Sequence, residues 1–264
     1  LRQVNLGGTA VGTGLGADRR YVFLVIEKLR ELTGLGLARA ENTVDPTQNA
    51  DVFVEVSGLL KAGAVTLAKI SGDLRLLSSG PGAGLAEIAL PQLQPGSSIM
   101  PGKVNPVLAE MLNMAMYHVI GLDTAVALAS QAGQLELNVM MPIIAHDLFE
   151  MMHVMIGAIN AFTDKCVVGI KANRAKAEGW LARNTIVVTA LNPIIGYLAG
   201  AALVKEALSR DLTVQEVALE KVREGALKHK DTGQPLTEEE IRAVFSDMRK
   251  LTEGGLFGGG GAGG

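Results

Sequence analysis

Three successive stretches with apolar residues at helical spacing constrain this sequence more than any other feature. They cover residues 45–77, 105–133 and 135–166. In the first, apolar residues recur every three or four positions, which predicts a helix with one face turned toward a core. The other two are apolar on nearly every face, which is typical of helices buried in a large protein or at an oligomer interface. At 1.5 Å per residue, each stretch would span about 45 Å, so we expect an extended helical bundle that associates with other subunits.

The shorter segments also indicate helices, and no alternating strand pattern is convincing. A helix is expected over residues 18–32, ended by Gly34 and Gly36. Residues 184–204 are uncharged and long enough for a membrane span, but Asn192-Pro193 interrupts them. We interpret that stretch as a buried helix–turn–helix and expect no membrane contact.

The C-terminal part reads as a separate, smaller domain. Thr237 with an acidic residue three positions on is a capping signal that predicts a helix over 241–251. The predicted fold class is therefore all-α, with the latter part of a central long-helix bundle at residues 1–191 and a small helical domain at 192–253. Residues 254–264 are mostly glycine and are expected to form a flexible tail.

Composition excludes several classes of function. Lys and Arg total 24 against 27 Asp and Glu, a net charge of -3, so no basic field exists to bind a nucleic acid. The single cysteine, Cys166, excludes an intrachain disulfide and a site made of several thiolates. No signal-peptide pattern opens the sequence. We expect a cytoplasmic location, which suits a chain without disulfides.

A glycine run at residues 7–17 raises a competing function. Gly12, Gly14 and Ala17 fit G-x-G-x-x-A, the fingerprint of dinucleotide-binding oxidoreductases. That function needs a βαβ unit with an acidic residue after the second strand, and Glu41 lies too late for the usual spacing. We favour a loop whose glycines let neighbouring segments pack closely.

Residues 95–106 form a second glycine- and proline-rich segment, Pro-Gly-Ser-Ser-Ile-Met-Pro-Gly-Lys-Val-Asn-Pro. Two hydroxyls, a lysine and an amide precede a predicted helix. Free backbone N–H groups and the helix dipole favour negative charge at such a place, so the loop is suited to bind a carboxylate. A flexible surface turn fits the composition equally well.

The eleven residues 96–106, G-S-S-I-M-P-G-K-V-N-P, resemble the signature loop of the aspartase/fumarase superfamily. Residues 6–14, 74–81, 135–139 and 189–192 are similar to further family segments in the same order. The resemblance implies an all-helical homotetramer whose active sites combine segments of several subunits. It also implies that this sequence matches the C-terminal portion of a longer family chain, so we expect residues 1–264 alone to be inactive.

Within the superfamily, the aspartase branch is favoured over class II fumarases. Leu76-Leu-Ser-Ser-Gly-Pro81 and Gln131-Ala-Gly-Gln-Leu-Glu-Leu-Asn-Val139 resemble aspartases, whereas Tyr197 is more like fumarases. The implied reaction is anti elimination of ammonia from L-aspartate, giving fumarate through an aci-carboxylate intermediate. Hydration of fumarate to malate and a non-catalytic subunit on the same scaffold remain the alternatives.

The resemblance assigns roles to five residues. Ser97 would be the base that removes the C3 proton, with Ser98 shaping the loop and contacting substrate. Lys103 and Asn105 would bind a carboxylate of the four-carbon dicarboxylate and stabilise its added charge. Glu110 would orient a histidine of another subunit. No cofactor and no metal are implied.

Histidines and two departures from the family pattern complete the expectations. His118, His146 and His153 lack a carboxylate at ligand spacing, so we interpret them as core or interface residues. Gly16 and Gly72 stand where the family commonly has Asn, which brings local packing into question.

Overall fold

The computed structural model describes residues 1–246 and divides the chain into two compact units. Unit 1 is Leu1–Ala172, and unit 2 begins at Asn173. The boundary therefore lies N-terminal to the 191/192 division expected from the sequence, because residues 173–191 pack with the helices that follow them. The proposed tail at 254–264 lies outside the described residues.

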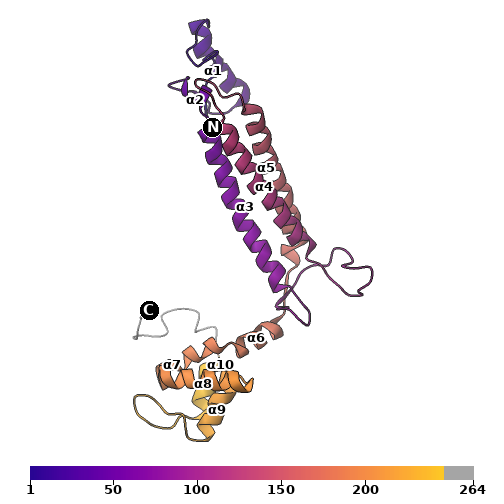
Figure 1. Ribbon diagram of the computed structural model, residues 1–264, viewed down its shortest axis with the longest axis vertical. Coiled ribbons are helices and arrows are strands. Elements are labelled where there is room, and N and C mark those ends of the chain that lie inside the picture. Colours follow the sequence, from indigo (N-terminus) through magenta and orange to yellow (C-terminus); the bar gives the residue numbers. More distant parts are fainter. Residues whose placement is uncertain (247–264) are drawn as a thin grey trace. The chain divides into compact units, whose positions relative to one another are not determined.

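Three long helices make up the body of unit 1 and run side by side (Figure 1). They are α3 (Asp51–Leu77), α4 (Val107–Gln131) and α5 (Met141–Lys165). Before them come α1 (Arg19–Thr33) and the short α2 (Asp45–Gln48). The all-α fold class is confirmed. The strands found in residues 1–246 are two-residue segments: β1 (Gln3–Val4) pairs with β2 (Ala38–Arg39) in parallel, and β3 (Ile88–Ala89) pairs with β4 (Lys171–Ala172) in antiparallel.

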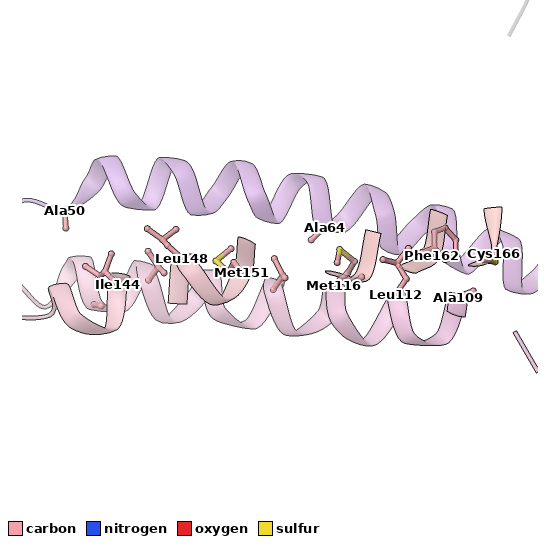
Figure 2. Close-up of a cluster of buried hydrophobic side chains, with 14 residues drawn as sticks. Ala50, Ala64, Ala109, Leu112, Met116, Ile144, Leu148, Met151, Phe162 and Cys166 are labelled. Atoms are coloured by element: carbon pink, nitrogen blue, oxygen red, sulfur yellow. The ribbon is translucent and has the colours of Figure 1, made fainter. Parts of the chain in front are cut away.

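The core of unit 1 follows the seam between these three helices (Figure 2). Leu112 and Met116 of α4 are fully buried, and so are Ile144 and Met151 of α5. Leucine, methionine and small residues fill the seam, in keeping with the scarcity of aromatic residues in the chain. Two stretches, α4 and Met141–Gly169, are long and apolar enough to cross a membrane. The core helices of a helical bundle meet the same criterion of length and composition.

The helix expected over 45–77 is interrupted, which corrects the sequence prediction. Asn49 adopts an extended conformation between α2 and α3. In a continuous helix the Thr47 carbonyl would accept the N–H of the residue four positions on. Here it accepts the backbone N–H of Asn138 at 3.1 Å instead. A contact from a distant segment therefore ends α2.

Helix α5 begins later than predicted, at Met141. Gln134 and Leu137 close a turn through paired backbone hydrogen bonds of 2.9 and 3.2 Å. The side-chain amide of Asn138 donates to the carbonyls of Ala129 and Ser130, and its oxygen accepts the Met140 N–H. These bonds hold residues 134–140 outside the helical conformation. The start of α1 agrees with the prediction: Asp18 caps it through the Arg20 N–H at 2.7 Å.

Unit 2 contains shorter helices around its own core. They are α6 (Arg174–Arg183), the 3-10 helix η2 (Thr185–Ala190), α7 (Asn192–Ile195), α8 (Tyr197–Arg210), α9 (Val214–Arg223) and α10 (Glu238–Ser246). The stretch 184–204 thus contains a 3-10 helix and two α-helices rather than a continuous span, and Leu191 within it is fully buried. Asn192-Pro193 begins α7, and the interruption lies four residues later than the sequence indicated, at Gly196 (φ 81°) between α7 and α8. The predicted cap of α10 is confirmed, because Thr237 and Glu240 exchange side-chain-to-backbone bonds of 2.8 and 3.2 Å.

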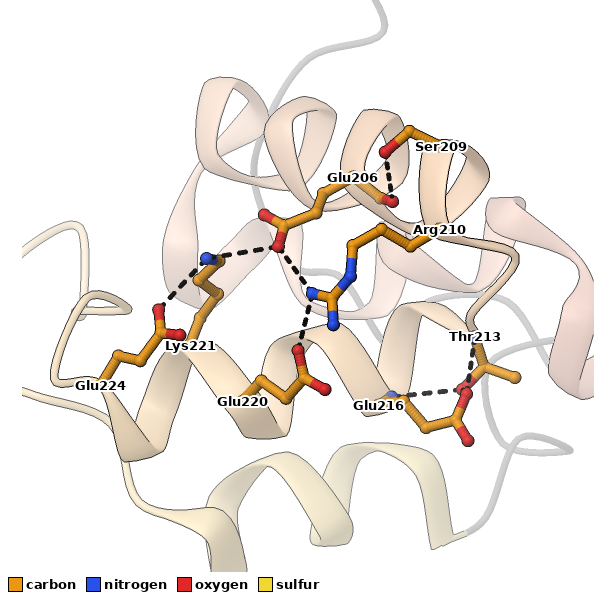
Figure 3. Close-up of polar contacts among 8 residues, drawn as sticks. All are labelled: Glu206, Ser209, Arg210, Thr213, Glu216, Glu220, Lys221 and Glu224. Atoms are coloured by element: carbon orange, nitrogen blue, oxygen red, sulfur yellow. Dashed lines mark hydrogen bonds and ion pairs between the residues drawn. The ribbon is translucent and has the colours of Figure 1, made fainter.

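A chain of ion pairs covers the surface between α8 and α9 (Figure 3). Arg210 contacts Glu206 at 2.8 Å and Glu220 at 2.7 Å. Lys221 contacts Glu206 at 3.3 Å and Glu224 at 3.1 Å. Hydrogen bonding to Arg210 and Lys221 lowers the pKa of Glu206 despite some desolvation. Because solvent screens the charges of these groups, we expect each pair to contribute little to the stability of unit 2.

Candidate active site

The loop at residues 95–106 lies between β3 and α4 and is closed by its own backbone. The Gly96 N–H donates to the Lys103 carbonyl at 3.0 Å. The Asn105 side-chain amide donates to the Gly96 carbonyl, also at 3.0 Å. A Cβ atom at Gly96 would lie 2.2 Å from the Lys103 oxygen, so only glycine permits this approach. Ser97, Lys103 and Asn105 are therefore brought together in one closed loop.

The Ser97 hydroxyl accepts hydrogen bonds from the backbone of its own loop. Its Oγ accepts the backbone N–H of Ile99 at 3.2 Å and that of Met100 at 3.1 Å. Its side chain is half-buried. Two N–H donors directed at one oxygen stabilise negative charge on it, which is the requirement for a serine to act as an alkoxide base.

The remaining loop residues differ in their exposure and in the hydrogen bonds they make. Ser98 and Lys103 are exposed, and within residues 1–246 no carboxylate pairs with the Lys103 ammonium group. Asn105 is half-buried and uses one amide N–H on Gly96, which leaves its second N–H for a ligand. A free ammonium beside a free amide N–H can bind a carboxylate from solvent.

Glu110 lies on the first turns of α4, whereas Lys103 lies in the loop before that helix. Its Oε1 is 3.9 Å from Nη2 of Arg75, at the end of α3. Arg75 Nη1 also donates to the side-chain oxygen of buried Asn113 at 3.2 Å. Sequence reasoning missed Arg75 and Asn113 because the contacts join helices far apart in the chain; the only signal was that Arg75 falls within a family-like segment, residues 74–81.

The glycine run at residues 7–17 packs against its own chain. Thr43 Oγ1 donates to the Gly12 carbonyl at 2.6 Å, and a Cβ at Gly12 would lie 2.4 Å from Thr43 O. The loop does lie in a β1–α1–β2 arrangement, but each strand has two residues. This geometry supports the close-packing interpretation over the dinucleotide one.

The two departures from the family pattern leave packing intact. A Cβ atom at Gly16 or Gly72 would meet no heavy atom within 4 Å among the described residues. The histidine interpretation needs a correction: His118, His146 and His153 are all exposed on unit 1, so none is a core residue. Their role at an interface stays a prediction. Within residues 1–246, no group of three His, Cys, Asp or Glu side chains could hold a metal ion.

Comparison with known proteins identifies the family to which this chain belongs. Two family models match the chain, one described as "Lyase" over residues 1–121 and one as "Fumarase C C-terminus" over residues 187–253. The aspartate ammonia-lyase of Bacillus subtilis (strain 168) is 44% identical over 98% of this chain and 52% of its own length. That of Helicobacter pylori (strain ATCC 700392 / 26695) is 50% identical over 96% of this chain and 51% of its own length.

Solved structures agree in fold. A fumarate lyase:delta crystallin from Brucella melitensis bound to cobalt superposes with a TM-score of 0.85 at 40% identity, covering 94% of this chain and 51% of that one. A class II fumarase from Schistosoma mansoni gives 0.75 at 32% identity, covering 92% and 53%. The chain spans about half the length of the curated relatives it matches. These findings show that it belongs to the aspartase/fumarase family of lyases.

Proposed function

We propose that the protein to which this chain belongs eliminates ammonia from L-aspartate to give fumarate. One observation carries the proposal: the Ser97 Oγ accepts two backbone N–H groups within a loop that also presents the Lys103 ammonium, which has no carboxylate partner among residues 1–246. A polarised base and a carboxylate-binding cation in one loop fit proton removal next to a carboxylate. The names of the relatives, aspartate ammonia-lyases at 42–50% identity, support the aspartate substrate.

The loop can perform the first step in the following way. The Ser97 alkoxide takes the C3 proton and becomes a hydroxyl, while the C3–H electron pair moves into the adjacent carboxylate. The resulting aci-carboxylate carries two negative charges, which Lys103 and the free Asn105 N–H stabilise. The electrons then return to form the C2–C3 double bond, and the C2–N bond breaks as the ammonium group leaves as neutral ammonia. The ammonia takes up the proton held by Ser97 and departs as ammonium, which restores the alkoxide.

Hydration and dehydration between fumarate and malate is the second candidate. The "Fumarase C C-terminus" match over residues 187–253 and the likeness to a class II fumarase favour it. The same loop chemistry would serve, since only the C2 leaving group changes from ammonia to water. That group would be contacted by residues other than the loop, so the loop alone does not distinguish the two reactions.

We also propose a homotetramer with composite active sites. Large apolar side chains lie exposed along the bundle: Leu59 of α3, Met114 and Leu128 of α4, and Phe149 and Ile156 of α5 are 61–72% exposed. Exposed apolar surface of this extent marks an association site. We further propose a cytoplasmic location, consistent with the free thiol of Cys166.

The test compares two substrates on the whole protein in its assembled form. Fumarate is followed by ultraviolet absorbance with L-aspartate and with L-malate in parallel, and Ser97→Ala serves as the control for contaminating lyases. Turnover of aspartate, lost in Ser97→Ala, supports the proposal. Turnover of malate alone moves the assignment to a fumarase, and turnover of neither favours the non-catalytic alternative. Residues 1–264 alone are expected to show no turnover.

A further inference from the structure

Polar side chains join α3 and α4 directly behind the signature loop. Ser71 Oγ donates to the Ala109 carbonyl at 2.6 Å, and Ser71 is fully buried. The side-chain amide of Asn113, 3% exposed, donates to the Ala68 carbonyl at 2.8 Å. These two bonds fix the first turns of α4 against the last turns of α3, in a region otherwise packed with apolar side chains.

Arg75 extends this junction to the surface. One guanidinium nitrogen, Nη1, donates to the Asn113 oxygen, while Nη2 lies 3.9 Å from Glu110 Oε1. Because guanidinium is planar and its donors are fixed in a fork, the bond to buried Asn113 sets the direction of the nitrogen that faces Glu110. The second oxygen of Glu110 has no hydrogen-bond or ion-pair partner among the described residues.

Stability alone does not account for Arg75. The side chains of Arg75 and Glu110 are 43% and 40% exposed, and an ion pair so exposed adds little to stability. Yet Glu110 follows the loop that holds Ser97, Lys103 and Asn105 by a single helical turn. A small displacement of Glu110 would therefore shift the neighbouring loop residues, and a shift of about 1 Å at an active site can lower the rate about a hundredfold.

We propose that Arg75 is a positioning residue for the active site: held by Asn113, it orients the Glu110 carboxylate at the start of α4. The inference rests on the proposed function, because Glu110 has a role in turnover only if the protein is a lyase. Arg75 itself touches no substrate in this account and acts through Glu110.

A double-mutant cycle on the assembled whole protein tests this role. We expect Arg75→Ala to lower kcat about tenfold to a hundredfold with little change in KM. In a Glu110→Gln background the same substitution should change kcat less than about twofold, because the group through which it acts is gone. Lys69→Ala is the matched control: it removes another cation of α3, whose ion-pair partner Asp73 lies on the same helix, and should leave kcat unchanged.

Hydrogen exchange supplies a readout that does not require turnover. Losing the Arg75–Asn113 bond should speed amide exchange of residues 107–113 by about 2- to 10-fold and leave residues 120–131 unchanged, since one net hydrogen bond is worth about 0.5–1.5 kcal/mol. If the parent turns over neither aspartate nor malate, the proposed function fails and the positioning role fails with it, while the exchange data still show whether Arg75 holds the start of α4 through Asn113. The inference is overturned if Arg75→Ala matches Lys69→Ala in exchange, if its kcat equals the parent's, or if its effect is as large with Glu110→Gln as without.

Discussion

Substituting Gly96 by alanine should disable the signature loop while leaving the bundle folded. The new Cβ would lie 2.2 Å from the Lys103 oxygen and 2.6 Å from its carbonyl carbon. Both neighbours are backbone atoms, so no side-chain rotation relieves the clash. The backbone at Gly96 and the backbone at Lys103 must move apart by about 1 Å to reach van der Waals contact.

That separation has two calculable effects. The Gly96–Lys103 hydrogen bond of 3.0 Å is lost or weakened, at a cost of about 1 kcal/mol in an exposed loop. Lys103 moves relative to Ser97 by a similar distance of about 1 Å, which should lower kcat/KM about a hundredfold. The free energy of unfolding should therefore change little while catalysis is nearly abolished.

The assay measures fumarate formation from aspartate by the whole protein, together with thermal unfolding. Gly58→Ala is the matched control, because a Cβ at that position in α3 meets no heavy atom within 4 Å. Replacing a glycine inside a helix should stabilise by about 0.5–1 kcal/mol and leave turnover unchanged. A Gly96→Ala protein that keeps kcat/KM within about threefold of the parent would refute this reasoning.

Three further predictions concern unit 1. Leu112→Ala, at a fully buried position of α4, should reduce the free energy of unfolding by about 2–5 kcal/mol in denaturant titration, and a loss below about 1 kcal/mol would contradict the packing described. Burial of Asp123 opposes its ionisation, but hydrogen bonds from Lys61 (2.5 Å) and Ser57 (2.7 Å) outweigh it and lower the pKa of this carboxyl. The ionised Asp123 therefore stabilises the fold near neutral pH, and this contribution is lost as the pH falls below 3.8, the ordinary pKa of an aspartate. The difference in free energy of unfolding between the parent and Asp123→Asn should narrow in that range. A difference that stays constant with pH would contradict the prediction. Burial raises the pKa of the Cys166 thiol, so a thiol reagent should label it only as fast as the protein opens, and rapid labelling of the folded protein would disagree.

The long helices were predictable from sequence because their signals are local. Apolar spacing located α3, α4 and α5, and the structure confirms the capping signal at Thr237, although α10 begins at Glu238 and not at 241. The capping residues act on N–H groups within the next turn, so sequence neighbours contain all the information needed.

The errors arose where a distant segment competes for a backbone group. Asn49 carries no proline or glycine signal, and α2 ends there because Asn138 takes the Thr47 carbonyl. The signature loop was located by its residues, but its closure through Gly96 and the two N–H groups on Ser97 depends on three-dimensional approach. The link from Arg75 to Glu110 likewise joins two helices, and no local pattern announces it.

Whether Ser97 is the base of a lyase is decided by the kcat of Ser97→Ala on L-aspartate, with substrate affinity measured alongside. Removing a general base costs about 100- to 10,000-fold in rate. We expect a loss of that size in kcat with a much smaller change in KM, because the hydroxyl acts on the C3 proton while Lys103 and Asn105 bind the carboxylate. A Ser97→Ala protein with kcat within about tenfold of the parent would contradict the claim.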